Sequence, residues 1–78
     1  MQLKVITSDR EILNTPVERV VLPGEGGMME ILPQHARLVS LLQSGEIQFS
    51  DQTKSGNIKI SSGLVEIAND NICALVEI

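Results

Sequence analysis

Apolar and polar residues alternate in short runs along this 78-residue chain, and turn-forming residues separate the runs. In residues 2–7, Leu3, Val5 and Thr7 share one face, and residues 46–50 alternate in the same way. Side chains of a strand point to opposite faces in turn, so a period of two predicts half-buried β-strands. The runs that we expect to form strands are residues 2–7, 11–16, 17–22, 28–32, 36–42, 46–50, 58–61, 64–68 and 71–78.

Some eight to ten short strands, spaced by roughly 8–12 residues with turns between them, predict an all-β sandwich or flattened barrel. We expect residues 1–78 to form a single domain, because a chain this short does not divide further. Pro16 cannot donate to a strand ladder, so it interrupts its strand or lies at a sheet edge. Residues 36–42 fit a helical stripe as well as a strand, but seven residues are short for a helix, and we expect a strand.

The composition excludes several classes of function. Proteins that bind single-stranded nucleic acids stack bases on aromatic rings and hold phosphates with clustered Lys and Arg. This chain has a net charge of −4 and Phe49 as its single aromatic residue, so we set nucleic acid aside. Cys73 is the only cysteine, which excludes an internal disulfide, and its alternating surroundings predict a core thiol.

The apolar runs are too short for membrane insertion. None approaches the ~18 residues of a membrane-spanning helix. The N-terminus also lacks the basic start and apolar middle of a signal peptide. We therefore expect a soluble, intracellular protein that reaches a membrane only through partners.

The alternation breaks in residues 20–38, which hold half of the glycines, two of the three prolines and the only histidine. Gly supplies positive φ and Pro fixes φ, so this stretch predicts a loop between two apolar runs. Residues 24–27 lack the Lys and the Ser or Thr of a phosphate-binding P-loop, and no helix pattern follows them. We expect a tight turn between strands there.

Four side chains could have a role beyond folding. His35 is either a solvated loop residue or a contact residue, since recognition groups concentrate on loops. Met28 and Met29 are adjacent in a strand, so one of them should face outward, where Met is an adaptable contact side chain. Lys54 at a hairpin tip is either a solubilising turn residue or a modified carrier lysine. We expect no catalytic, cofactor-binding or metal-binding residue, because no Ser-His-Asp set or ligand cluster occurs in the sequence.

Several motifs taken together resemble the ε subunit family of bacterial F-type ATP synthases, which corresponds to the δ subunit of mitochondria. Residues 22–27 read Leu-Pro-Gly-Glu-Gly-Gly, and residues 31–38 read Ile-Leu-Pro-Gln-His-Ala-Arg-Leu. Residues 61–67 read Ser-Ser-Gly-Leu-Val-Glu-Ile, and Leu42, Gly45 and Asn71 lie at compatible spacings. The resemblance covers essentially the whole chain in order.

This resemblance implies a non-catalytic rotor subunit of a proton- or sodium-translocating ATP synthase. Its β-sandwich would bind the γ subunit through one side and the membrane c-ring through one end, and would itself bind neither ATP nor a cofactor. The complex would place it peripherally at the cytoplasmic face of the bacterial inner membrane. The residues implied to face the c-ring are Pro23, Gly24, Glu25, Gly26, Gly27 and Met28, with His35 nearby on the adjacent loop.

The chain differs from the family pattern at four positions in this region. Met28 stands where a carboxylate often reaches the ring, so we expect an apolar contact or one supplied by Glu25. Gln34 replaces the Gly before the histidine, Arg37 replaces a Pro, and Glu30 stands where Gly is common.

Two further expectations follow. Many family members carry a C-terminal pair of helices that can inhibit ATP hydrolysis, whereas this sequence ends at the sandwich. If the gene ends there too, we expect rotary coupling without that brake. The alternative function is a lipoyl- or biotinyl-carrier domain of similar size with Lys54 modified, although the residues that flank the lysine in carrier motifs are missing.

Overall fold

The computed structural model describes residues 1–78, which form nine β-strands and no helix. This confirms the predicted all-β fold. None of its segments is a helix long and apolar enough to cross a membrane. The strands are β1 (Gln2–Ile6), β2 (Glu11–Pro16), β3 (Arg19–Gly24), β4 (Gly27–Ile31), β5 (Leu38–Leu42), β6 (Gly45–Ser50), β7 (Ser55–Ile60), β8 (Ser62–Ala68) and β9 (Asn71–Glu77).

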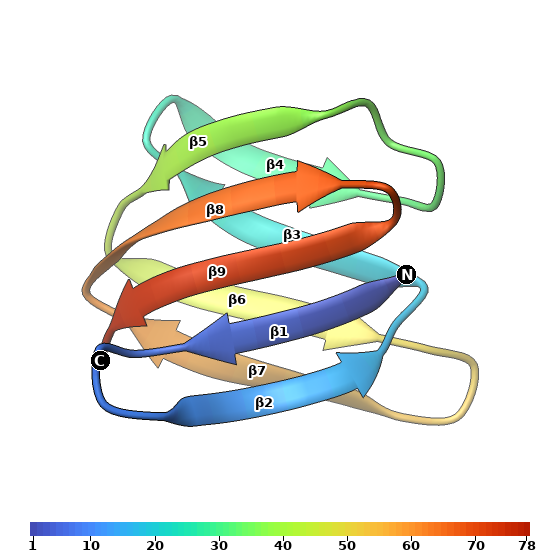
Figure 1. The fold of residues 1–78 in the computed structure, drawn as a ribbon, viewed down its shortest axis with the longest axis horizontal. Helices are drawn as coiled ribbons and strands as arrows, with labels where there is room; N and C mark the ends of the chain where they lie inside the picture. Colours follow the sequence, from blue (N-terminus) through green and yellow to red (C-terminus); the bar gives the residue numbers. More distant parts are fainter.

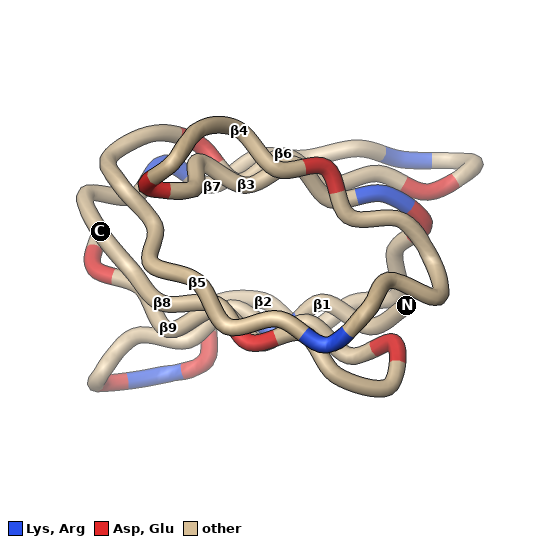
Figure 2. The backbone as a smooth tube through the Cα atoms, turned by 90° about the horizontal axis from the view of Figure 1, so that it is seen from above, with Lys and Arg blue, Asp and Glu red and all other residues tan.

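The strands form one curled mixed sheet that folds over itself into two layers (Figure 1; Figure 2). One layer has the order β2-β1-β9-β8-β5, and the other contains β4, β3, β6 and β7. The layers join at a corner where β3 meets β5 through the single pair Gly24–Leu42. All pairings are antiparallel except that of β1 with β9, which places the first and last strands side by side inside one layer.

The core lies between the two layers and is built from the inward-facing residues of the strands. Leu3 and Val5 are fully buried on β1, as the alternation predicted, and Phe49 and Met29 pack against the core from its margin. The core is aliphatic throughout. Its members are Leu3, Val5, Val17, Val20, Leu22, Ile31, Leu42, Ile47, Ile60, Val65, Ile67, Ile72, Ala74 and Val76.

Several strand limits differ from the prediction. Strand β5 begins at Leu38 rather than at residue 36, which confirms a strand there but shortens it. Strand β2 extends to Pro16 and lies at a sheet edge, the second of the two places allowed for this proline. Strand β3 continues through Pro23, whose carbonyl accepts a hydrogen bond from the Gln43 N–H at 2.8 Å. Strand β7 begins early, at Ser55.

The prediction that Cys73 is a core thiol is wrong. Ile72 and Ala74 are buried, so the period of two turns Cys73 outward, and its thiol is free and partly exposed. It lies opposite Glu66 of β8 and Lys4 of β1. The sequence misled here because β9 carries apolar residues on both faces.

The β6–β7 turn is held by Asp51. Its Oδ1 accepts backbone hydrogen bonds from Thr53, at 2.8 Å, and from Lys54, at 2.9 Å, and a third from the Thr53 hydroxyl. The two backbone hydrogen bonds stabilise the charged carboxylate and lower the pKa of Asp51, and the bond from Thr53 has the larger effect.

We expect this turn to loosen in acid. The pKa of Asp51 is lower in the folded chain than in the unfolded chain. The stability that the Asp51 carboxylate gives to the turn is therefore present above the unfolded pKa of about 3.9 and is lost as the pH falls through the lower folded pKa. An NMR titration should show the Thr53 and Lys54 amide shifts moving with a midpoint below that of an ordinary aspartate. The variant Asp51→Asn should abolish this titration, and an ordinary midpoint in the unmodified chain would contradict the assignment.

Candidate functional site

The predicted loop at residues 23–28 is a tight hairpin turn between β3 and β4. Only Glu25 and Gly26 lie outside the two strands, and Gly24 pairs with Gly27, which has a φ of 132°. The expected tight turn is confirmed, but the loop is shorter than the motif suggested. Pro23 and Gly24 are buried, whereas residues 25–28 are exposed and form what we call the hairpin end.

Gly24 has a structural role. A Cβ at this position would lie 2.7 Å from the Gly27 carbonyl oxygen and 3.2 Å from the Met29 side chain. The backbone carbonyl cannot move aside as a flexible side chain could, so a larger residue would distort the hairpin itself. Substitution of Gly24 therefore cannot report on partner contacts alone.

The two methionines point to opposite faces, as predicted. Met28 is 63% exposed, and Met29 packs against the core. Glu25 is exposed in the turn, and its backbone N–H donates a hydrogen bond to the Leu41 carbonyl at 3.0 Å. The hairpin end thus offers one exposed apolar side chain and one exposed carboxylate.

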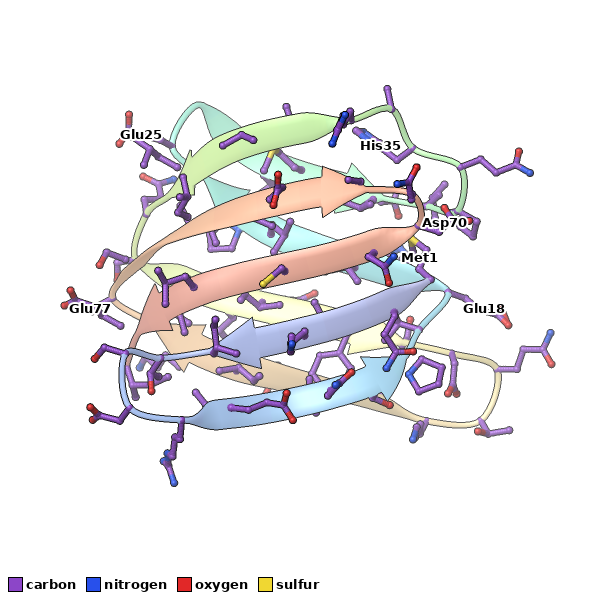
Figure 3. The ribbon with its side chains drawn as sticks, viewed as in Figure 1. Met1, Glu18, Glu25, His35, Asp70 and Glu77 are labelled. Atoms are coloured by element: carbon purple, nitrogen blue, oxygen red, sulfur yellow. The ribbon has the colours of Figure 1, made fainter.

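His35 does not lie near the hairpin end, so the expectation that it does is wrong. Figure 3 shows Glu25 and His35 at opposite ends of the sandwich. Strand β4 runs between the two connections, and its five residues span roughly 17 Å. The imidazole Nδ1 of His35 lies 2.6 Å from the Ala36 carbonyl oxygen, and the side chain is exposed.

The loop that carries His35 is anchored by Asp70, a residue that the sequence did not reveal as important. The Gln34 backbone N–H donates to the Asp70 Oδ1 at 2.8 Å. Gln34 has a φ of 68°, the left-handed conformation that the family's glycine at this position adopts freely. Asn69 and Asp70, in the hairpin turn between β8 and β9, also have positive φ. The contact between Asp70 and Gln34 spans 36 residues of sequence and leaves no local signal.

We expect Asp70→Gly to free this loop without straining the turn between β8 and β9, because glycine adopts the φ of 60° found at this position. Left-handed backbone costs a non-glycine residue about 1–2 kcal/mol, and the lost hydrogen bond no longer offsets that cost at Gln34. Hydrogen exchange should show reduced protection of the Gln34 amide, with the strands unchanged. Combining the change with Gln34→Gly removes the strain and should shrink the effect on loop order. Equal protection of the Gln34 amide in Asp70→Gly and in the unmodified chain would contradict the anchor.

Glu30 is another position at which the chain departs from the family pattern. It lies in β4 without positive φ, and its carboxylate forms an ion pair with Arg19 of β3 on the outer face of that layer. The substitution at this position is therefore accommodated by an ordinary strand.

A row of exposed aliphatic side chains crosses the outer face of the other layer. Leu41 of β5 lies opposite Leu64 of β8, Leu64 lies opposite Leu75 of β9, and Leu75 lies opposite Ile6 of β1. The three leucines are 52%, 41% and 46% exposed. We call Ile6, Leu41, Leu64 and Leu75 the outer row. The sequence signal was present, because each is apolar at a position that the alternation assigns to solvent.

The remaining candidates form no chemical constellation. No group of three or more His, Cys, Asp or Glu side chains is placed to hold a metal ion. Lys54 is exposed in the β6–β7 turn. The structure therefore presents two surfaces for contact, the hairpin end and the outer row, and sets His35 apart from both.

The fold is shared with subunits of rotary ATP synthases. A chain in the central stalk and c-ring structure of the Tetrahymena thermophila mitochondrial ATP synthase superposes with a TM-score of 0.82, at 18% identity, over 100% of this chain and 63% of that one. A chain of the Euglena gracilis mitochondrial ATP synthase superposes with a TM-score of 0.87, at 22% identity, over 95% of this chain and 48% of that one.

Sequence relatives agree with the fold. This chain is 34% identical over 77 residues to the ATP synthase epsilon chain of Dehalococcoides mccartyi, covering 99% of this chain and 55% of that protein. It is 37% identical over 76 residues to the chloroplastic ATP synthase epsilon chain of Phaeodactylum tricornutum, and the match covers 97% of this chain and 57% of that protein. The chain thus spans little more than half of these relatives. The family model of the ATP synthase delta/epsilon chain β-sandwich domain matches residues 1–78, and the chain belongs to that family.

Proposed function

We propose that this chain is the β-sandwich of a central-stalk rotor subunit of an F-type ATP synthase, which couples rotation of the c-ring to the γ subunit without chemistry of its own. Such a part needs two docking surfaces on one rigid body. The outer row and the hairpin end meet this need. The hydrogen bond from the Glu25 N–H to the Leu41 carbonyl joins them directly, and this is the observation that carries the proposal.

The outer row is the proposed contact with γ. Three exposed leucines and the partly buried Ile6 lie in register on four adjacent strands and form a continuous apolar surface, and such surfaces mark interaction sites. Val39, one row away on β5, extends this surface and is 62% exposed. Burying it against a partner contributes roughly 25 cal/mol for each Å² of apolar area.

The hairpin end is the proposed contact with the c-ring. Met28 supplies a flexible apolar side chain, and Glu25 supplies the carboxylate that this chain lacks at the position of Met28. His35 lies at the opposite end (Figure 3) and is not part of this contact. In this arrangement the subunit is attached to the membrane only through the complex, at its cytoplasmic side, and the ring determines whether protons or sodium ions are transported.

The carrier alternative rests on Lys54 alone. The family match covers all 78 residues and accounts for the motifs, whereas nothing flanking Lys54 matches a carrier motif. The mass of the chain purified from its source decides between the two, because a lipoyl or biotinyl group adds a defined mass to Lys54.

The direct test is assembly followed by ATP-driven ion pumping. The 78-residue chain should co-purify with γ and the c-ring and should restore ATP-driven pumping to membranes depleted of the subunit. Met28→Lys should lower pumping relative to ATP hydrolysis without lowering the melting temperature, because the side chain is exposed. Normal pumping by this variant would overturn the assignment of the hairpin end, and failure to bind γ would overturn the proposed function.

A further inference from the structure

We propose that the groove between the outer row and the hairpin end receives an amphipathic helix of the rotor partner, with an apolar stripe and a basic flank. This inference rests on the proposed function and names the kind of segment that docks there. The residues that line the groove include the leucines Leu41, Leu64 and Leu75, which we call its floor. They also include Asp9, Arg10, Glu25, Glu77 and Ile78, which we call its rim.

The floor excludes an added strand. Strand β8 pairs with β5 and β9, and β9 pairs with β8 and β1, so the backbone groups beneath the groove are already used. An extended peptide would leave its own N–H and C=O groups without partners on this face. A helix satisfies its backbone internally and offers side chains alone.

The spacing of the outer row fits a helix laid along it. Side chains in one row are separated by the distance between strands, about 4.8 Å. One turn of a helix rises about 5.4 Å, so successive turns present side chains at nearly the same interval. Side chains on one face of an extended chain lie roughly 6.6 Å apart, so an extended peptide would lose register with the outer row within two positions.

The rim selects a basic partner. Three carboxylates, Asp9, Glu25 and Glu77, line the groove together with the leucines, and none of them forms an ion pair within the chain. Arg10 is the one cation on the rim, so the carboxylates outnumber it. Figure 3 shows Glu25 and Glu77 at the same end of the sandwich. Lysine or arginine along one flank of an apolar stripe complements this arrangement.

The first test uses the 78-residue chain and a fluorescently labelled 14-residue helical peptide. The peptide carries Leu along one stripe of the helix and Lys along the flank of that stripe. We expect this peptide to bind, with NMR shift changes at Leu64 and Leu75 and an affinity that falls with added salt. A matched peptide with Glu in place of Lys should bind at least tenfold more weakly. Equal affinity for both peptides, shift changes on β6 and β7, or a dimer of the chain in sedimentation in place of peptide binding would overturn the proposal.

The second test separates this inference from the proposed function. The double variant Glu25→Gln/Glu77→Gln should weaken binding to the Lys peptide and to γ by about three- to tenfold at low salt. The matched control Glu18→Gln/Glu46→Gln neutralises two exposed carboxylates outside the groove and should leave both affinities unchanged. If the unmodified chain binds γ and the first double variant binds it equally well, the helix proposal fails while the rotor function stands.

Discussion

Truncating Ile67 to alanine should cost about 2–5 kcal/mol of unfolding free energy, the range for deleting a buried aliphatic side chain. Ile67 is 1% exposed on β8 and lies between Leu38 and Ile72 on the neighbouring strands. The total unfolding free energy of a domain of this size is roughly 4–12 kcal/mol. The variant should therefore lose a large part of its stability and partly unfold near physiological temperature.

Urea unfolding measures this loss, because the midpoint falls while the slope stays constant if the fold is otherwise intact. Glu66→Ala is the matched control, since Glu66 precedes Ile67 on β8 but faces outward and is exposed. The unfolding free energy of Glu66→Ala should stay within about 0.5 kcal/mol of that of the unmodified chain. A wild-type midpoint for Ile67→Ala would show that β8 presents its other face to the core.

The largest effect on assembly is expected from Leu64→Gln/Leu75→Gln. In the isolated chain the two leucines are about half exposed. Each leucine should therefore contribute about 1 kcal/mol to the binding free energy when a partner covers it. Glutamine also carries an amide that needs hydrogen-bond partners in the interface. The affinity for γ should fall about 10- to 100-fold, while the melting temperature changes little.

A pull-down titration with γ measures this effect. Leu32→Gln is the control, because Leu32 is 49% exposed but lies outside the outer row, after β4. It should retain the affinity of the unmodified chain. If the double variant binds γ normally, the outer row is not the γ contact, and a loss of folding in that variant would show that the leucines stabilise the sandwich instead.

Much of the fold could be predicted because it depends on local alternation. The period of two identified the strands, and Pro16, Met28 and Met29 behaved as their chemistry required. Where both faces of a strand are apolar, the alternation is ambiguous. This is why Cys73 was assigned to the core although Ile72 and Ala74 occupy the inward positions.

The candidate site was predicted less completely. The motif located the hairpin end, but it grouped His35 with Glu25, and sequence proximity says nothing about which end of a strand a loop occupies. The Asp70 anchor of Gln34 joins residues 36 positions apart and has no local signature. The outer row exists only because the register of four strands aligns its members.

The stretch of residues 20–38 shows what each level determines. By itself the sequence determined the all-β class, a tight turn within residues 24–27, and the family, because these depend on short-range periodicity, turn chemistry and motif order. Only the tertiary structure decided that Gly24 is a packing position, that His35 lies at the far end, and that four aliphatic residues form one surface. These properties arise from strand pairing and from the corner between the layers, where close backbone approach and register bring distant residues together.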